Sequence, residues 1–305
     1  MFDLIIIGGG PAGVAAGVYA ARKKLKTLLI TEGFGGQSTD SGGIENWIGT
    51  VNITGTDFSK TLEAHLRFYV NDSVEIKLNK VNKVNKLEVG KFEVGVESGE
   101  KFQTKTILIA TGSTRRKLEA KGAKEFENKG ITYCASCDGP LFTGQDVVVI
   151  GGGNAAFETA AQLLAYTNSV TLIHRNDTFR ADEVTVEKVL ANPKMKAIKS
   201  AVVREIKGDK FVNALVYESD GREQELKVSG VFVEIGLIPT TWFVEGLVDL
   251  TDIKQIKVNP KTQRASVEGI WAAGDSTDGL YHQNNIAAGD AVKALEDLYL
   301  YVHTH

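Results

Sequence analysis

The sequence of 305 residues predicts an α/β protein of two parallel-sheet units, the second inserted into the first. Three observations predict this organisation. A short apolar strand, a glycine-rich turn and a helix follow one another near the N-terminus, and the same series returns from residue 146. A last apolar strand and helix, 270–275 and 284–302, have no glycine-rich turn of their own. They are therefore expected to complete the first unit, because strands alternating with helices build parallel sheets.

The first turn follows the apolar run 3–7, which is typical of a buried parallel strand. Its glycines have the spacing G-x-G-x-x-G, and a helix is expected over 14–24. Such glycines allow a tight turn, close approach of a pyrophosphate and helix–strand packing, and the helix N-terminus attracts phosphate. The next strand, 27–31, ends at an acid placed to bind ribose hydroxyls. A dinucleotide without a 2′-phosphate, such as FAD, is predicted on Gly8, Gly10, Pro11, Ala12, Gly13 and Glu32.

The second turn follows the strand 146–150 and opens a helix expected over 154–166. The next strand, 169–173, ends at a histidine and an arginine, where the first unit has an acid. An arginine attracts a 2′-phosphate that a carboxylate would repel, which favours NADPH, with NADH left possible. The alternatives are two purely structural turns and an arginine that is only solvated. The expected residues are Gly151, Gly153, Asn154, Ala155, Ala156, His174, Arg175 and Arg180.

Short alternating segments surround these two Rossmann-like units. The runs expected as antiparallel strands or β-meanders are 74–78, 81–88, 91–97, 101–106, 202–207, 211–217 and 223–228, and the apolar runs 107–112 and 231–239 are expected as further strands. The chain would cross between the units near 112–117 and 239–246, and two crossing strands make a natural hinge. The expected domains are 1–113 with 245–305 for FAD, and 114–244 for NAD(P)H.

Charge and hydropathy exclude several classes of function. The net charge is −3 and the pI is about 6.0, so a basic nucleic-acid surface is not expected. No apolar run approaches the ~18 residues of a membrane span, and the first one has no basic flank of a signal peptide. A cytoplasmic protein that binds neither nucleic acid nor membrane is therefore expected.

The cysteines form a single C-x-x-C pair, Cys134 and Cys137, followed by Asp138. Three interpretations stay open: a zinc site, two inert buried cysteines, or a redox dithiol. Zinc takes about four ligands, and no histidine lies within ten residues of the pair, so no metal site is expected. A redox pair benefits from close spacing, because one thiolate can attack the mixed disulfide of the other. Asp138 could move a proton to a leaving thiolate or simply stabilise a helix start.

Together these motifs resemble those of the low-molecular-weight thioredoxin reductases. The matching pieces run in family order over nearly the whole chain: IIIGGGPAG, GGQ at 35–37, ENWIG at 45–49, IATG at 109–112, CASCDG at 134–139, GGGNAAFE at 151–158, HRNDTFR at 174–180 and AAGD at 272–275. CDGPLF and GVFVEIGLIPTT also resemble the C-terminal part of the alkyl hydroperoxide reductase flavoprotein. That protein carries an extra N-terminal domain that is not expected here.

The resemblance implies further site residues and their roles. FAD would also contact Gly36, Gln37, Asn46, Ala110, Thr111, Gly112, Gly274, Asp275, His282 and Gln283. Electrons would pass from NADPH through the flavin to the Cys134–Cys137 disulfide, with Cys137 next to the flavin. Cys134 would attack the disulfide of thioredoxin or a thioredoxin-like protein, and Asp138 would be the general acid. The family is usually a homodimer.

Four departures from the family pattern concern the donor and the partner rather than the fold. The pattern HRRxxxR has Asn176 at its third position, and the Tyr-Arg-Gln before the last helix has His282 in the middle. The stretch 38–43 reads STDSGG instead of being threonine-rich, and Asp290 replaces a small residue. The alternatives left open are an NADH or ferredoxin donor, a peroxidase-linked or glutaredoxin-like partner, and a non-enzymatic redox-sensing flavoprotein. A ferredoxin–NADP reductase of the same fold would lack the dithiol.

Overall fold

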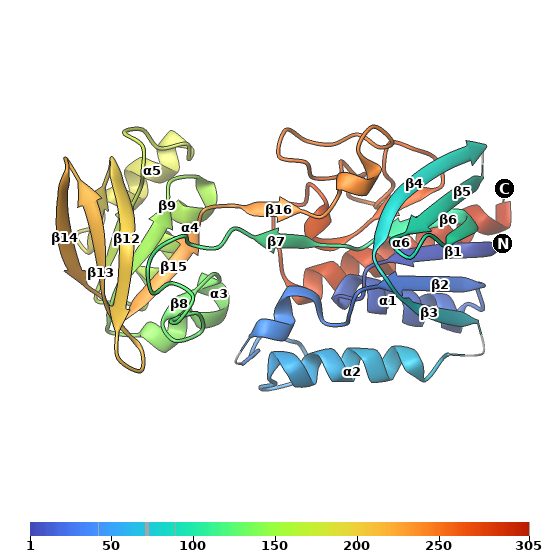
Figure 1. Cartoon of the computed structure of the whole chain (residues 1–305), viewed down its shortest axis with the longest axis horizontal. Helices are drawn as coiled ribbons and strands as arrows, with labels where there is room; N and C mark the ends of the chain where they lie inside the picture. The colour runs from blue at the N-terminus through green and yellow to red at the C-terminus, as the bar shows by residue number, and fades with distance from the viewer. Residues whose placement is uncertain (42, 71–72, 89, 305) are drawn as a thin grey trace. The chain divides into compact units, whose positions relative to one another are not determined.

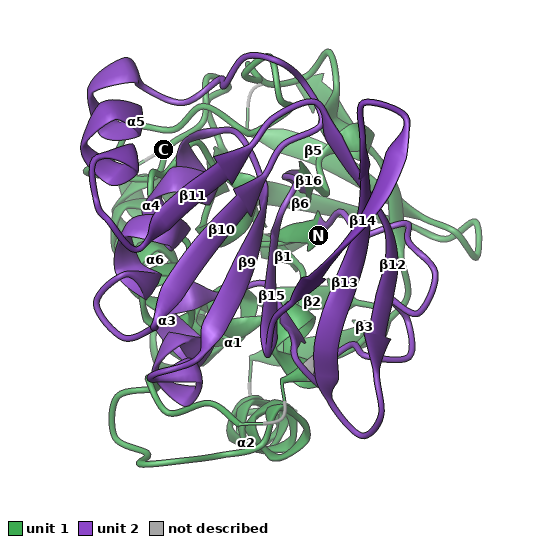
Figure 2. Ribbon diagram, turned by 90° about the vertical axis from the view of Figure 1, so that its left-hand side faces the viewer, with its two compact units in different colours: residues 1–114, 238–305 green, residues 115–237 purple. Residues whose placement is uncertain are grey.

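The computed structural model of the chain describes residues 1–41, 43–70, 73–88 and 90–304. Its contacts divide the chain into two compact units (Figures 1 and 2). Unit 1 is Met1–Thr114 with Ile238–His305, and unit 2 is Arg115–Leu237. The α/β class with parallel sheets is confirmed. Within the described residues, no helix combines the length and hydropathy that crossing a membrane requires.

Unit 1 is built on one seven-stranded sheet. Its order is β3-β2-β1-β6-β5-β4, and β17 also pairs with β6. The elements are β1 (Phe2–Ile7), α1 (Pro11–Arg22), β2 (Thr27–Thr31), η1 (Gly36–Asp40), α2 (Gly55–Arg67), β3 (Val74–Leu78), β4 (Val81–Glu88), β5 (Lys91–Val96), β6 (Lys101–Ile109), β7 (Ser113–Arg115), β16 (Leu237–Pro239), η3 (Trp242–Val244), β17 (Ile270–Ala272), η4 (Gly274–Ser276) and α6 (Asn284–Thr304).

Two strand predictions for unit 1 need correction. Residues 74–78 form a strand, but it pairs parallel with β2 at the sheet edge instead of joining the antiparallel meander. Residues 101–106 and the start of 107–112 form the single strand β6. The first half of β6 pairs antiparallel with β5, and its second half pairs parallel with β1 and β17. One long strand thus belongs to both the meander and the parallel sheet.

The strand β1 is apolar throughout because it is covered on both faces. Leu4 and Ile6 pack on one face with α1 and α6, whereas Ile5 and Ile7 pack on the other with β4, β5 and the segment around Val244. The contact between α1 and α6 uses small residues that let the two backbones approach. These are Ala12, Ala16 and Ala20 on α1 and Ala287, Ala291 and Ala294 on α6.

Unit 2 has a five-stranded parallel sheet of order β11-β10-β9-β15-β8 and an antiparallel sheet β12-β13-β14. Helices cover one face of the parallel sheet and the antiparallel sheet covers the other (Figure 2). The elements are β8 (Ile131–Thr132), α3 (Ala135–Asp138), η2 (Gly139–Phe142), β9 (Asp146–Gly151), α4 (Asn154–Leu163), β10 (Ser169–Ile173), α5 (Glu183–Leu190), β11 (Met195–Ile198), β12 (Ala201–Gly208), β13 (Val212–Ser219), β14 (Arg222–Lys227) and β15 (Gly230–Glu234).

The two chain crossings, β7 and β16, pair with each other as a two-stranded sheet. The second crossing comes earlier than the sequence predicted. Residues 238–244 belong to unit 1 rather than to the inserted unit. The reason is burial, since Phe243 and Val244 lie in the unit 1 core beside Ile7 and Ile109.

Candidate functional site

The turn after β1 is shaped by two glycines that leave no room for a side chain. Gly8 has φ +119°, and a Cβ on it would lie 2.2 Å from the carbonyl oxygen of Ala110. A Cβ on Gly13 would lie 1.9 Å from the carbonyl oxygen of Gly8. Gly10 differs, because the nearest atom to its Cβ position is the Cα of Gly36 at 4.0 Å. The middle glycine therefore faces space that the described residues leave free.

The helix α1 begins at Pro11 with Gly10 as its N-cap, and no described side chain caps it. Its first backbone N–H groups are thus available to an anion, as the pyrophosphate of a dinucleotide requires. Glu32 follows β2 directly and is exposed. These features fit FAD, with the glycine turn for the pyrophosphate and Glu32 for a ribose.

Predicted site residues from distant parts of unit 1 meet in one polar cluster. The Gln37 amide donates to Ser113 Oγ at 3.2 Å and to Asp275 Oδ2 at 3.3 Å. His282 Nδ1 lies 3.3 Å from Asp275 Oδ1. Gln37 lies in η1, Ser113 in the first crossing strand β7 and Asp275 in η4, so the cluster links three distant parts of unit 1. Ser113 was not predicted from the sequence, and no local motif marks it.

A second network ties the segment before α2 to the start of α6. Asn46 Nδ2 donates to Gln283 Oε1 at 3.1 Å, and Asn285 Nδ2 donates to the carbonyl of Asn46 at 2.7 Å. Ser38 Oγ donates to Asn284 Oδ1 at 2.8 Å. Ser38 belongs to the unusual STDSGG stretch, of which residue 42 lies outside the described residues. The structure therefore places Asn46 beside Gln283, and both are predicted contacts of FAD.

The remaining predicted residues of unit 1 line the same edge of the sheet. Thr111 Oγ1 donates to the carbonyl of Thr240, and Thr240 N donates to the carbonyl of Gly112. These bonds attach the loop after β6 to the second crossing. A Cβ on Gly274 would lie 3.1 Å from the Cβ of Ala287 and 3.5 Å from that of Ala12. Gly274 therefore lets the start of α1 and α6 approach each other.

Unit 2 repeats the arrangement of the first turn. A Cβ on Gly151 would lie 2.3 Å from the carbonyl oxygen of Glu234 and 2.9 Å from the Cβ of Ala156. Gly153 has no atom within 4 Å of its Cβ position and is the N-cap of α4, which no described side chain caps. Asn154 Oδ1 accepts a hydrogen bond from Asp182 N at 2.8 Å. Asn154 and Ala155 are exposed at the helix start, and this turn also fits a dinucleotide.

His174 lies under the second turn rather than in front of it. A Cβ on Gly152 would lie 2.3 Å from the imidazole, which is buried. Burial lowers the pKa of His174 although Nε2 lies 3.0 Å from the carbonyl oxygen of Thr178. A neutral imidazole that donates to this carbonyl supports the turn. His174, which the sequence suggested as a cofactor contact, therefore packs beneath the glycine turn.

Three cationic side chains near this histidine are exposed to solvent. Arg175, Arg180 and Lys199 are exposed, and each lowers the pKa of His174 after the larger effect of burial. Arg180 N donates to the carbonyl of Gly152 at 2.7 Å. Lys199 Nζ lies 4.7 Å from the centre of the Phe179 ring. Lys199 was missed because residues 195–198 were not predicted as a strand; β11 pairs with β10 and so brings Lys199 to the carboxyl edge.

The two cysteines form a disulfide at the start of α3, with 5.3 Å between their Cα atoms. Cys134 is the N-cap residue, and its Sγ accepts a hydrogen bond from Cys137 N at 3.2 Å. Cys134 is half-buried and Cys137 is exposed. Among the described residues, no group of three or more His, Cys, Asp or Glu side chains could hold a metal ion. The arrangement fits a redox disulfide rather than a zinc ligand pair.

Asp138 directly follows Cys137 at the end of α3 and is partly buried. Burial raises the pKa of Asp138, while a hydrogen bond from Thr132 Oγ1 and the charge of Arg115 lower it less. Arg115 also lies 5.5 Å from the centre of the Tyr133 ring. Thr132, which the sequence did not single out, holds the carboxyl beside the disulfide. A raised pKa favours the protonated carboxyl, which is the form that a general acid requires.

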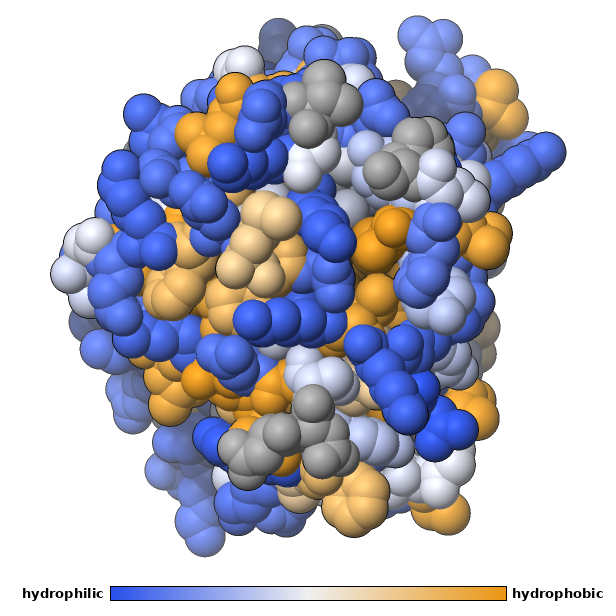
Figure 3. Space-filling model, turned by 90° about the vertical axis from the view of Figure 1, so that its right-hand side faces the viewer, coloured by the Kyte–Doolittle hydropathy of each residue, from blue (hydrophilic) through white to orange (hydrophobic). Residues whose placement is uncertain are grey.

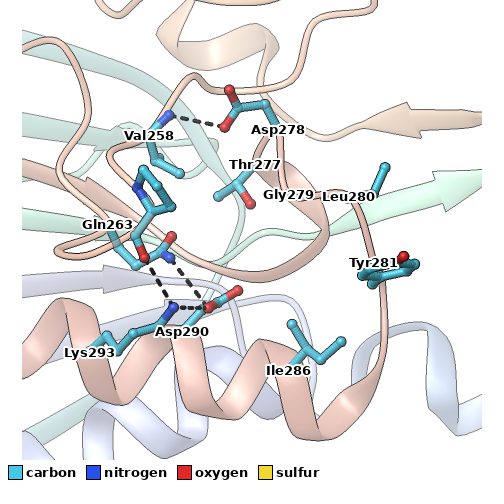
Figure 4. Close-up of a pocket in the computed structure, with 11 residues that line it drawn as sticks. Val258, Gln263, Thr277, Asp278, Gly279, Leu280, Tyr281, Ile286, Asp290 and Lys293 are labelled. Atoms are coloured by element: carbon cyan, nitrogen blue, oxygen red, sulfur yellow. Dashed lines mark hydrogen bonds and ion pairs between the residues drawn. The ribbon is translucent and has the colours of Figure 1, made fainter.

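A separate cavity of about 390 Å³ lies in unit 1 between the α6 start and the loops 258–263 and 277–281 (Figure 4). Gln263 has φ +61° and is buried, and its Nε2 donates to Asp290 Oδ1 at 3.3 Å. Lys293 pairs with Asp290 at 2.8 Å. The unusual residue Asp290 therefore binds a buried amide. The cavity is lined by none of the predicted cofactor residues.

The family follows from comparison with known proteins. Residues 2–291 match the model of the pyridine nucleotide-disulphide oxidoreductases, and the chain belongs to this family. Thioredoxin reductase structures are similar over almost the whole chain. That from Streptococcus pyogenes is 33% identical with a TM-score of 0.91, covering 100% of this chain and 99% of that one. That from Giardia duodenalis is 32% identical with a TM-score of 0.94, covering 99% of each.

Curated relatives carry other names. The NADH dehydrogenase of Bacillus subtilis is 39% identical over 295 residues, which is 96% of this chain and 57% of that protein. The F component of the alkyl hydroperoxide reductase of Pseudomonas aeruginosa is 39% identical over 301 residues, again 96% and 57%. The chain thus spans little more than half the length of these relatives. The resemblance to low-molecular-weight thioredoxin reductases is confirmed, and the cofactors are FAD and NAD(P)H.

Proposed function

We propose that this chain is a flavoprotein disulfide reductase that carries electrons from NADPH to the disulfide of a thioredoxin-like protein. The observation that carries the proposal is the Cys134–Cys137 disulfide at the start of α3, beside a partly buried Asp138. It lies in the same unit as the second dinucleotide turn. In the overall reaction, NADPH, a proton and the partner disulfide give NADP⁺ and the partner dithiol.

The two units divide the binding of the cofactors. Unit 1 holds FAD, with its pyrophosphate at Gly8, Gly10 and Gly13 and its remaining groups beside the Gln37–Asp275–His282 cluster and the Asn46–Gln283 pair. Unit 2 holds NAD(P)H, with the pyrophosphate at the α4 start. When bound, FAD supplies the two-electron step between the nicotinamide and the disulfide. The paired β7 and β16 strands are the proposed hinge between the units.

The dithiol residues have distinct proposed roles. Cys137 faces the flavin, and Cys134 attacks the partner disulfide to form a mixed disulfide. Cys137 then attacks Cys134, which releases the partner dithiol and restores the Cys134–Cys137 bond. Asp138 gives its proton to the leaving thiolate, which its raised pKa supports.

The test is steady-state reduction of an oxidised thioredoxin by the FAD-loaded protein, followed by the loss of NADPH absorbance. We expect turnover that depends on both thioredoxin and NADPH. A protein whose flavin NADPH reduces once, without turnover on any redoxin, would instead be a redox sensor. That outcome would overturn the proposed enzyme.

A second candidate has the same chemistry with another donor or partner. Relatives named as an NADH dehydrogenase and as the F component of an alkyl hydroperoxide reductase are 39% identical, and Asn176 removes one cation from the predicted phosphate site. The assay therefore needs parallel arms with NADPH, NADH and reduced ferredoxin. Each donor is combined with thioredoxin, with a peroxidase-linked redoxin and with a glutaredoxin-like protein. The arm with the highest kcat/KM identifies the donor and partner.

We also propose that the protein is a cytoplasmic homodimer. Support comes from large apolar side chains exposed on unit 1, among them Ile48, Val51 and Phe68. Figure 3 shows apolar patches between hydrophilic side chains on one face. Exposed apolar surface of this kind often marks interfaces between chains. Light scattering coupled to size exclusion should give twice the 33.0 kDa chain mass.

A further inference from the structure

Glu234 occupies the place in unit 2 where the strand order reverses. It is the last residue of β15, and it pairs with Gly151 at the end of β9. From β9 the chain goes to β10 and β11 on one side, and it returns to β15 on the other (Figure 2). Dinucleotides bind across the crevice outside the carboxyl ends of the strands at such a switch point. Glu234 therefore borders the bound nucleotide.

The two halves of the nucleotide have different surroundings at this edge. The cations Arg175 and Arg180 lie in the loop after β10, and Lys199 follows β11, on one side of the glycine turn. Their positive charges would attract the 2′-phosphate on the ribose of NADPH. The nicotinamide half then extends to the other side of β9, which is the side of Glu234. This step rests on the proposed function, in which unit 2 binds NAD(P)H.

The carboxyl of Glu234 is largely buried and has few neighbours that carry charge. Thr159 Oγ1 on α4 donates to its Oε1 at 2.9 Å. Burial is the largest effect on the pKa of Glu234 and raises it to about 7. The hydrogen bond from Thr159 and the charge of Arg115 at the end of β7 lower this pKa, and Glu158 on α4 raises it. The backbone of Glu234, rather than its carboxyl, pairs with Gly151 at the end of β9.

We propose that Glu234 matches its charge to the nicotinamide ring, being neutral opposite the uncharged reduced ring and ionised opposite the cationic oxidised ring. The placement at the switch point supplies the contact, and burial makes the two protonation states close in free energy. An oxidised ring carries one positive charge, and an opposite charge within a few ångströms commonly lowers a carboxyl pKa by about 1–3 units.

The proton and electron balance is simple. When the hydride has passed to FAD, Glu234 breaks its O–H bond and releases one proton to solvent, and no electron leaves the carboxyl. When oxidised nucleotide is exchanged for reduced nucleotide, Glu234 takes a proton back from solvent. Glu234 thereby stabilises each form of the nucleotide with the matching charge. It is a specificity-determining residue for the redox state of the ring.

The test measures protons during binding and does not depend on turnover. The oxidised, FAD-loaded protein is titrated calorimetrically at pH 7 with NADP⁺, in buffers of different ionisation enthalpy. The matched ligand is 1,4,5,6-tetrahydro-NADPH, which has a neutral ring, the same 2′-phosphate and no hydride to give. We expect NADP⁺ to release about half a proton on binding, since Glu234 is about half ionised before binding, and the neutral analogue to take up about half a proton.

Two variants locate the proton. Glu234→Gln should remove the difference between the two ligands while both still bind. Thr159→Val removes the donor to Oε1 and should move the pH of maximal release upward, and it serves if Glu234→Gln fails to fold. Equal release for both ligands in the wild type, or an unchanged difference in Glu234→Gln, would overturn the role of Glu234 alone. Failure of both nucleotides to bind would overturn the proposed function and this inference together.

Discussion

At the scale of single residues, Gly10 and Gly13 of the first turn are glycines for different reasons. Gly13 is required by packing, because its Cβ position lies 1.9 Å from a carbonyl oxygen. Gly10 has room for a methyl group within the protein, since the nearest atom to its Cβ position lies at 4.0 Å. Only a bound pyrophosphate would be crowded there. The two glycines should therefore respond differently to the same substitution.

We predict that Gly13→Ala lowers the stability of unit 1 by several kcal/mol, roughly 3 or more, because backbone must move. Gly10→Ala should keep the melting temperature of the FAD-free protein within a few degrees and greatly weaken FAD binding. The measurements are thermal unfolding of the apoprotein and the FAD content after purification. A yellow Gly10→Ala protein with normal FAD content would show that the pyrophosphate lies elsewhere.

The cysteine roles can be separated by serine substitution. Cys134→Ser should abolish thioredoxin reduction and leave bleaching of the flavin by NADPH intact, because Cys134 attacks the partner. Serine is a favourable N-cap, so α3 should still form. Circular dichroism and the flavin spectrum control for folding. A Cys134→Ser protein that still turns over thioredoxin would disprove this assignment.

The raised pKa of Glu234 makes unit 2 sensitive to pH. The folded protein binds this proton up to about pH 7, whereas a free glutamate loses it near pH 4.5. Stability from this group is therefore complete below about pH 4.5 and is lost as pH rises through about 7, by at most about 3 kcal/mol. The melting temperature of Glu234→Gln minus that of the wild type should be larger at pH 8 than at pH 5, because only the wild type then has a buried carboxylate. An equal difference at both pH values would contradict the shift.

At the scale of elements, the loops that follow β10 and β11 carry the three cations of the proposed phosphate site, Arg175, Arg180 and Lys199. Lys199→Ala should raise KM for NADPH about fivefold, which is about 1 kcal/mol for an exposed charged contact, and leave KM for NADH unchanged. Asn176→Arg should lower KM for NADPH by restoring a cation, by a free energy of roughly 1–3 kcal/mol. The NADH values are the internal control. Equal changes for both nucleotides would place the 2′-phosphate away from these residues.

The elements also show what the sequence could predict. Both glycine-rich turns, their flanking strands and α6 follow from local patterns, since G-x-G-x-x-G and apolar runs have direct physical causes. The pairing direction of β3 could not be predicted, because an edge strand has the same residue pattern whether it pairs parallel or antiparallel. The segment 113–130 is rich in charged residues, yet its Phe126 is buried in the unit 2 core.

The contents of the site were only partly predictable. The hydrogen bond between Gln37 and Asp275 spans 238 residues, and the family resemblance only assigned both residues to the same cofactor. Lys199, Thr132 and Glu234 were missed, because their roles depend on which strands end side by side. His174 was predicted as a cofactor contact from its place in the motif, yet its ring lies under Gly152. The position of a residue in the sequence predicted that it lies at the carboxyl edge of the sheet, but it did not predict where the side chain points.

At the scale of the whole molecule, the account joins two dinucleotide-binding units through paired crossing strands. Each unit has its own parallel sheet and its own pair of hydrophobic cores. The proposed electron path requires the nucleotide of unit 2 and the disulfide of unit 2 to exchange electrons with the flavin of unit 1. The proposed path therefore requires that NADPH reduce the Cys134–Cys137 disulfide.

Thiol labelling tests this claim most directly. The FAD-loaded protein is incubated anaerobically with NADPH, quenched, unfolded and alkylated, and the labels are counted by mass spectrometry. Cys134 and Cys137 are the only cysteines of the chain, so every label reports this pair. We predict both cysteines labelled after NADPH and neither without it. A flavin bleached by NADPH with the disulfide still intact would contradict the account.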